Sequence, residues 1–300
     1  MICKTTHNNY MTRLIQAKSI LSPLKKGSDP FFGIRYNMNL YRGCQHGCIY
    51  CDSRSKCYGI DNFTDIQVKE NSLELLEKEL RSKRERGTIG FGSMNDPYMP
   101  VEKELLLSRR ALEIIARYKY PLHIITKSAL VCRDIDLLKE TSKIYTAVSV
   151  TITTTSDTMS GQIEPGAPLS SVRFQTIRKL ADAGIYCGIL LMPVLPYLTD
   201  NPDNIEKMVM MAKDAGAQYI LACMGVTLRD GQREYFYEQL DKKFPGMKQN
   251  YMVRYGHDYS CDVPDSQKLW DLFRNTCQKV GMATSMKFYS PEIPVQQTLF

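Results

Sequence analysis

The amino-acid sequence predicts an α/β protein whose core is a partial (β/α)6 TIM-type barrel of parallel strands. Short apolar runs alternate with amphipathic helical segments six times between residues 34 and 225, a pattern typical of a parallel sheet covered by helices. Six such units are too few to close an eight-stranded barrel, so we expect an open one. The 300 residues, of which 43% are apolar, are enough to bury a substantial core.

The six units can be placed from their local patterns. A capping box formed by Asn71 and Glu74 predicts the start of the first helix, which Gly87 ends. Pro202 suits the first turn of a later helix, and Gly216 suits its end. Strands are expected within residues 34–43, 88–93, 121–128, 144–153, 185–196 and 217–225, with helices at 71–87, 103–119, 134–140, 170–184 and 201–216.

The stretches that carry reactive or polar side chains follow the expected strands. They are a cysteine-rich loop after the first strand, then "GSMNDPY", "TKS", "TITTT" and "MPVLP". In barrels of this kind, ligands bind at the carboxyl ends of the strands. The sequence therefore predicts a site at that end of the barrel.

Four regions follow from composition and pattern. They are a basic N-terminal extension (1–33), the barrel (34–225), a cap region (226–290) with one clear helix at 264–281, and a short tail (291–300). The first 28 residues contain five Lys or Arg and no acid, and the formal net charge of the chain is +7. A basic protein can favour a polyanion such as nucleic acid, although an ordinary solvated surface explains this charge equally well.

Nothing in the sequence indicates a membrane or a secretory route, so we expect a cytoplasmic protein. The longest apolar run, residues 188–195, is far too short to span a bilayer. The N-terminus lacks the apolar segment of a secretory signal. In a reducing compartment, clustered thiols are more often metal ligands or redox groups than disulfides.

Cys44, Cys48 and Cys51 form a C-x3-C-x2-C pattern on one tight loop. Thiolates bind zinc or iron–sulfur clusters. A structural zinc site needs four ligands, whereas three cysteines leave one iron of a cluster open to a small molecule. The pattern therefore favours a cluster, and zinc completed by His46 or Cys57 is the alternative.

This pattern, with an aromatic residue before the last cysteine, resembles the radical S-adenosylmethionine (SAM) superfamily. The stretch "NLYRGCQHGCIYCD" is similar to the spore photoproduct lyase-like branch, whose members are described as related to DNA repair photolyases. "GSMNDPYMPVE", "IITKS", "EPGAP" and "AGIYCGILLMPVLP" add to the resemblance, which covers roughly residues 18 to 280. It implies a barrel of the radical SAM kind, a [4Fe-4S] cluster on Cys44, Cys48 and Cys51, and SAM bound to the fourth iron.

The resemblance also implies a set of SAM-binding residues. Tyr50 would pack near the adenine, and Lys127 would reach the SAM carboxylate. Arg173 is a second candidate for that carboxylate, and the backbone of residues 193–195 would line the adenine. Turn chemistry, β-propensity or an exposed helix position are the ordinary alternatives for several of them. The full set is Tyr50, Ser93, Asn95, Asp96, Lys127, Ser149, Thr151 and Arg173.

The implied reaction is reductive cleavage of SAM to a 5′-deoxyadenosyl radical, which abstracts a hydrogen atom from the substrate. Spore photoproduct lyase has a hydrogen-donating cysteine next to its SAM-binding serine, and in this chain Gly92 holds that position. Tyr98, Cys187 and Cys223 are candidate donors, with plain packing as the alternative for each. Asp52, directly after the last ligand, could tune the cluster.

The last ten residues, "PEIPVQQTLF", end abruptly in two apolar side chains. Gln296, Leu299 and Phe300 resemble the Q-x-x-L-F peptide with which bacterial repair and replication proteins bind the DNA sliding clamp. Gln297 departs from that pattern, where leucine is usual. Packing of the tail on its own barrel is the alternative.

Together these observations predict a radical SAM enzyme that acts on a nucleic acid, as in the repair of a DNA lesion by a lyase-like reaction. A flavodoxin- or ferredoxin-type donor would supply the electron. A radical SAM enzyme for RNA, a peptide or a small metabolite is one alternative. A metal-bearing protein that binds nucleic acid without chemistry is the other.

Overall fold

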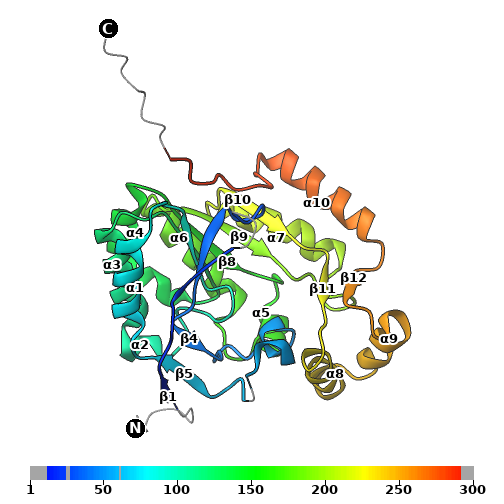
Figure 1. Ribbon diagram of the computed structural model, residues 1–300. Coiled ribbons are helices and arrows are strands. Elements are labelled where there is room, and N and C mark those ends of the chain that lie inside the picture. Colours follow the sequence, from blue (N-terminus) through cyan, green and yellow to red (C-terminus); the bar gives the residue numbers. More distant parts are fainter. Residues whose placement is uncertain (1–11, 25–27, 61, 292–300) are drawn as a thin grey trace.

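The computed structural model describes residues 12–24, 28–60 and 62–291. Its main feature is a seven-stranded sheet in the order β10-β9-β8-β7-β6-β3-β2, with helices along its outer face (Figure 1). The strands are β2 (Leu21–Pro23), β3 (Ile34–Met38), β6 (Thr88–Phe91), β7 (Leu122–Thr126), β8 (Thr146–Thr151), β9 (Tyr186–Leu191) and β10 (Tyr219–Ala222).

Six neighbouring strands, β3 and β6 to β10, are parallel, and β2 pairs antiparallel with β3 at one edge. The sheet formed by the described strands remains open, because β10 and β2 are its two edges. The predicted partial barrel of six parallel strands is therefore confirmed. All six side chains of β8 are buried, as expected for a central strand covered on both faces.

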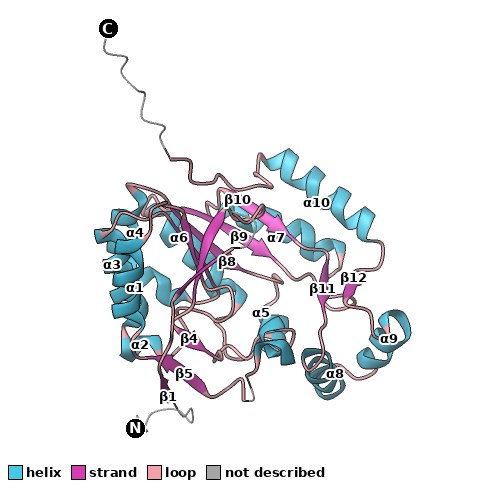
Figure 2. Cartoon of the chain, in the orientation of Figure 1, coloured by secondary structure: helices cyan, strands magenta, loops and turns pink. Residues whose placement is uncertain are grey.

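The helices that connect these strands pack their apolar stripes against the sheet. Leu76, Leu112, Ile177 and Val209 each come from a different helix and join the same buried core as the strand residue Val148. The helices are α1 (Ser72–Ser82), α3 (Leu107–Arg117), α4 (Ile135–Ser142), α6 (Ser170–Asp182) and α7 (Pro202–Asp214). Figure 2 shows them around the outside of the strands.

Three helix details differ from the prediction. The first helix ends at Ser82 and not at Gly87. The helix expected at residues 103–119 is split into α2 (Glu102–Leu105) and α3, because Leu106 adopts a left-handed conformation with φ of 51°. The predicted Asn71 capping box is wrong. The Asn71 side chain instead accepts from the Ala17 N–H and donates to the Ala17 carbonyl, both at 2.9 Å.

Small elements that the sequence did not reveal surround the cysteine loop. Strands β1 (Thr12–Ile15), β5 (Ile66–Lys69) and β4 (Tyr41–Arg42) form a second sheet beside it. Helix α5 (Asp157–Ile163) follows β8, and Glu164 lies directly after it. These elements are too short to give a periodic signal in the sequence.

Residues 225–280 continue beyond the barrel strands. The antiparallel pair β11 (Gly225–Thr227) and β12 (Ser260–Asp262) flanks helices α8 (Gln232–Lys243) and α9 (Met247–Tyr255). Helix α10 (Ser266–Val280), close to the predicted 264–281, packs along α7 (Figure 2). None of the helices in the described segments is both long and apolar enough to cross a bilayer.

Candidate active site

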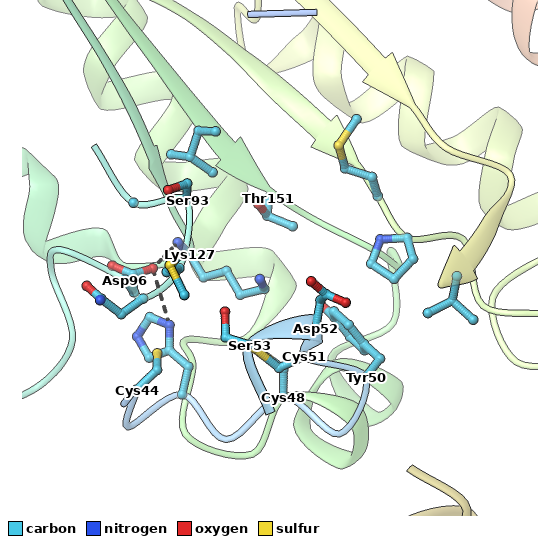
Figure 3. A pocket seen from close by; sticks show the side chains of 18 of the residues that line it. Cys44, Cys48, Tyr50, Cys51, Asp52, Ser53, Ser93, Asp96, Lys127 and Thr151 are labelled. Carbon is cyan, nitrogen blue, oxygen red and sulfur yellow. Dashed lines mark hydrogen bonds and ion pairs between the residues drawn. The ribbon is translucent and has the colours of Figure 1, made fainter. Parts of the chain in front are cut away.

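A cavity of about 410 Å³ lies at the carboxyl ends of the barrel strands, where the site was expected (Figure 3). Its walls come from the cysteine loop, from the residues that follow β6 to β10, and from β11. Cys44, Cys48 and Cys51 lie along one side of it, and Ser93 and Thr151 lie across from them (Figure 3).

The cysteine loop is held in place by backbone hydrogen bonds to distant segments. The Cys44 N–H donates to the Phe63 carbonyl, and the Ile49 N–H donates to the Ile163 carbonyl at 2.9 Å. Cys44 and Cys48 are buried, and burial raises the pKa of both thiols. All three thiols of the motif nevertheless face the cavity, so they are available to a bound group.

The arrangement of the donors favours a cluster over a single zinc ion. Within residues 12–24, 28–60 and 62–291, no three His, Cys, Asp or Glu side chains converge as they would around one metal ion. A cluster instead spreads its thiolates over separate irons. Of the two residues proposed to complete a zinc site, Cys57 is exposed and lies outside the cavity wall. His46 lines the cavity, with its Nδ1 3.3 Å from the Asp96 carboxylate.

Asp96 lines the cavity, but both of its oxygens have partners within the protein. Oδ1 accepts from the Thr126 hydroxyl (2.7 Å) and the Tyr98 N–H (2.8 Å), and Oδ2 accepts from the Lys127 N–H (2.7 Å) and faces His46. Burial opposes ionisation of Asp96, but the His46 contact and these hydrogen bonds outweigh it and lower its pKa to about 2. The carboxylate thus joins the cysteine loop to the ends of β6 and β7, and is not a free acceptor.

Two other residues of this turn, Ser93 and Asn95, remain available. The Asn95 amide donates to the Tyr41 carbonyl at 2.6 Å, while its Oδ1 is buried without a partner. Ser93 is exposed at the cavity wall. Ser93 and Asn95 therefore offer the free acceptors in this turn.

Lys127 extends into the cavity from the end of β7 (Figure 3). Its ammonium lies 4.0 Å from the Glu164 carboxylate and 5.7 Å from the centre of the Tyr50 ring. Burial opposes its charge, but Cys48 and Glu164 outweigh burial and raise the pKa of Lys127. Lys127 is therefore a cation that faces the cavity.

Arg173 does not reach the cavity, contrary to the prediction that it clamps a carboxylate there. Its guanidinium is fully buried, lies 2.6 Å from Glu164, and donates to the Pro168 and Thr151 carbonyls. The Tyr50 hydroxyl also donates to Glu164. Burial raises the pKa of Tyr50 above its ordinary value, so the Tyr50 hydroxyl keeps its proton.

Thr151 and Ser149 lie at different depths of the barrel. Thr151 ends β8 and lines the cavity. Ser149, two residues earlier, is fully buried and bonds to His123 (2.8 Å) and to the Tyr219 hydroxyl (2.6 Å). A strand advances about 6.6 Å over two residues, so Ser149 lies one layer below the site and does not line it.

Of the three candidate hydrogen donors, the structure brings only Cys223 to the cavity wall. Cys187 lies at the amino end of β9, fully buried, with its thiol directed to the Ile177 carbonyl of α6. Tyr98 is also fully buried, with its ring near the Arg133 guanidinium. Cys223 follows β10, is exposed, and lies at the same end of the barrel as the cysteine loop.

Gly92 has a backbone that tolerates no side chain. Its φ is +107°, and a Cβ built on it would lie 2.1 Å from the Ile125 carbonyl oxygen. A cysteine at this position, where the resemblance implied a hydrogen donor, therefore has no room here.

A search against protein-family models matches residues 38–212, more than half of the chain, to the model described as the radical SAM superfamily. The chain belongs to the radical SAM superfamily. It is thus an enzyme, and the alternative of a binding protein without chemistry is set aside. Enzymes of this superfamily use a [4Fe-4S] cluster and SAM, as predicted.

Individual relatives agree with this assignment. An uncharacterised protein of Mycobacterium tuberculosis is 29% identical over 89% of this chain and 82% of its own length. An uncharacterised protein of Methanocaldococcus jannaschii is 34% identical over 62% of this chain and 68% of its own length. The solved structure of spore photoproduct lyase complexed with dinucleoside spore photoproduct has a TM-score of 0.65 at 16% identity, over 90% of this chain and 79% of that one. That likeness establishes a shared fold.

The cavity of this radical SAM enzyme fits both cofactors. Three soft thiols on one loop suit a cluster with one open iron. Around the same cavity, Lys127 offers a cation for a carboxylate, Asn95 offers a free oxygen for an amino group, and the buried Tyr50 ring offers an apolar face.

Sequence reasoning missed two groups of residues at this site. One is Glu164, the acid of "EPGAP", which contacts Tyr50, Lys127 and Arg173. The rim was also missed. Arg229 lies 3.1 Å from Asp52, and β11 supplies part of the wall. An acid directly before a Pro-Gly turn was a signal for Glu164, but no local pattern links Arg229 to a loop 177 residues earlier.

Proposed function

We propose that this radical SAM enzyme abstracts a hydrogen atom from a nucleic-acid substrate held at the mouth of the cavity. The observation that carries the proposal is an arginine and an exposed tyrosine, Arg229 and Tyr259, that lie together beside the cavity residue Asp52. Arg229 contacts Asp52, donates to the Tyr259 hydroxyl at 3.1 Å, and has its guanidinium 5.3 Å from the centre of the Tyr259 ring. Tyr259 is 51% exposed. Proteins that bind single-stranded nucleic acid combine cations with aromatic faces on which bases stack.

The size of the cavity supports a substrate that is larger than the cavity itself. A volume of about 410 Å³ is that of a pocket for one small molecule. SAM would fill it, so the substrate presents its C–H bond from outside. An extruded nucleotide of a long polymer suits such an opening.

When bound, the cluster and SAM supply an electron and a 5′-deoxyadenosyl radical. The chain's own residues bind and orient. Lys127 and Asn95 would hold the two ends of the SAM amino-acid moiety, and Ser93 and Thr151 would complete the wall around it. The buried ring of Tyr50 covers part of the cavity wall and would help to exclude water from the reacting atoms.

Cys223 is proposed as the hydrogen donor to the substrate radical. It is the candidate thiol on the cavity wall, and an ordinary thiol keeps its proton at neutral pH. Transfer of its hydrogen atom would leave a thiyl radical at Sγ and a closed-shell product.

The likeness in fold to a lyase complexed with a dinucleoside supports a nucleotide substrate of the DNA-lesion type, and a lyase-like reaction. A cytoplasmic location fits the nine described cysteines, which form no disulfide. A flavodoxin- or ferredoxin-type protein is proposed as the electron donor. Binding to a DNA sliding clamp rests on sequence alone, since Gln296, Leu299 and Phe300 lie outside the described residues. It is tested by titrating clamp with the full chain and with Leu299→Ala.

The deciding experiment uses anaerobically reconstituted protein, reduced with dithionite and supplied with SAM, with 5′-deoxyadenosine measured by chromatography. Wild type is compared with Cys48→Ala, each with ultraviolet-damaged DNA, undamaged DNA, RNA or a peptide mixture. We expect product from wild type alone and an increase with damaged DNA. An increase with peptide alone would overturn the nucleic-acid proposal. No product from fully loaded protein would overturn the radical reaction as well.

A further inference from the structure

Two of the residues between the cluster ligands have polar side chains that contact buried carboxylates. His46, between Cys44 and Cys48, faces Asp96, and Tyr50, between Cys48 and Cys51, donates to Glu164. Asp96 follows β6, and Glu164 directly follows α5 in the connection from β8 to α6. The cysteine loop is thus tied to the barrel on each side of its central ligand.

The Glu164 contact is the more fully enclosed of the two. Glu164 and Arg173 are both 0% exposed, and Arg173 is fixed in turn by the carbonyls of Pro168 and Thr151. The Thr153 hydroxyl lies 3.4 Å from the same carboxylate. Glu164 therefore receives contacts from the segment after β8, from α6 and from the cysteine loop.

The charges in this group favour an ionised Glu164. Burial opposes its ionisation, but Arg173 and Lys127 outweigh burial and lower its pKa. One carboxylate beside two cations leaves the group with one net positive charge, carried by Lys127 at the cavity. Arg173 is thus the counter-ion of Glu164, and Lys127 is the cation left for a ligand.

Asp96, like Glu164, is a carboxylate that other parts of the barrel hold in place. Its two oxygens receive the Thr126 hydroxyl and the N–H groups of Tyr98 and Lys127, so the carboxylate cannot move without breaking the ends of β6 and β7. His46 is only 2% exposed and is held against this fixed anion.

We propose that Asp96 and Glu164 are positioning residues that hold the cysteine loop in its cluster-binding arrangement before the cluster arrives. Neither needs to touch the cluster, because each acts through the loop residue that it binds. Groups that orient metal ligands from outside typically change metal affinity or activity by about 10- to 100-fold when removed. This inference concerns how the cluster is held, so its test does not depend on the identity of the substrate.

The test measures how fast reconstituted protein loses iron to a chelator, with no nucleic acid present. Glu164→Gln and Tyr50→Phe should each lose iron about tenfold faster than wild type. The double variant should lose iron no faster than Glu164→Gln alone, because that change already breaks the contact that Tyr50→Phe removes. Asp96→Asn, which weakens the second tie, should also accelerate the loss.

Asp134→Asn is the matched control. Asp134 is equally buried and is paired with Arg109 and Arg133, outside the cysteine loop. We expect this variant to unfold more easily yet lose iron at the wild-type rate, and to give the wild-type electron paramagnetic resonance spectrum. Wild-type rates for Glu164→Gln and Asp96→Asn, the same acceleration in Asp134→Asn, or additive losses in the double variant would overturn the proposal.

Discussion

The Arg173 guanidinium lies 2.6 Å from the Glu164 carboxylate, and neither side chain is exposed to solvent. Removing one member of such a pair leaves the other as an uncompensated buried charge, which costs about 3–5 kcal/mol. We therefore expect Arg173→Met to lower the free energy of unfolding by that amount in urea titrations. Arg178→Met, an exposed change on the same helix, should stay within about 0.5 kcal/mol of wild type. Equal effects of the two changes would contradict this view of the pair.

Lys127 should matter for SAM binding and not for cluster content. Its ammonium faces the cavity, and a hydrogen bond to a charged group contributes about 1.5–3 kcal/mol. Lys127→Met should thus raise the Kd for SAM about 10- to 100-fold, with wild-type iron content. Isothermal titration of the loaded protein under anaerobic conditions measures this, and Lys213→Met on α7 is the control. An unchanged Kd would remove Lys127 from the SAM site.

Replacement of Cys223 should separate radical formation from product formation. Cys223→Ala keeps the ligands and the SAM-binding residues, so 5′-deoxyadenosine should still form. Without the thiol, the substrate radical has no proposed donor, and the yield of product per 5′-deoxyadenosine should fall. Chromatography of both species measures the ratio. Cys187→Ala should keep the wild-type ratio, since Cys187 lies away from the cavity, and a wild-type ratio in Cys223→Ala would exclude Cys223 as the donor.

Arg229 should contribute to nucleic-acid affinity without affecting cluster or SAM binding. If it contacts a phosphate, Arg229→Ala should weaken binding of a single-stranded oligonucleotide and reduce the slope of log Kd against log salt by about one. Fluorescence anisotropy at several salt concentrations gives that slope. Arg274→Ala, an exposed arginine on α10 paired with Asp271, should leave the slope unchanged. An effect of equal size there would indicate general charge attraction.

Because of His123, the free energy of unfolding should decrease on mild acidification. Burial lowers the pKa of His123 to about 3, from an ordinary value near 6.5. Between pH 6.5 and 3, His123 is therefore protonated in the unfolded chain and neutral in the folded chain. The free energy of unfolding thus decreases as the pH falls from 6.5 toward 3. Between pH 7.5 and 5.5 the contribution is about 1.4 kcal/mol. Urea unfolding should show this loss in wild type, and a smaller loss in His123→Gln; identical pH profiles would contradict it.

The sequence predicted the barrel well because each central strand is a short apolar run bounded by helices with clear periodicity. Residues 144–153, for example, contain β8, and all of its side chains are buried. Local patterns in the sequence could not predict contacts between distant segments. Asn71 looked like a helix cap, but Ala17 takes both polar groups of its side chain.

The same limit applies to the site. The spacing of the three cysteines was enough to predict that their thiols lie together, because the motif lies within one short loop. Ser149 and Thr151 share one face of a strand, and alternation alone could not tell which of them reaches the cavity. Arg173 seemed free because its partner, Glu164, comes from the end of another helix. Cys187 lies at the opposite end of its strand from the cavity, which only the strand boundaries reveal.

The tight backbone at Gly92 limits how this enzyme and spore photoproduct lyase can be interconverted. A side chain there would collide with the Ile125 carbonyl, next to the pairing of Phe91 with Ile124 that joins β6 to β7. A single codon change to cysteine would therefore force those two strands apart. Any evolutionary or engineered route that places a hydrogen-donating side chain at position 92 has to remodel the β6–β7 backbone first, so a donor at this place would be inherited with the barrel and not with one residue.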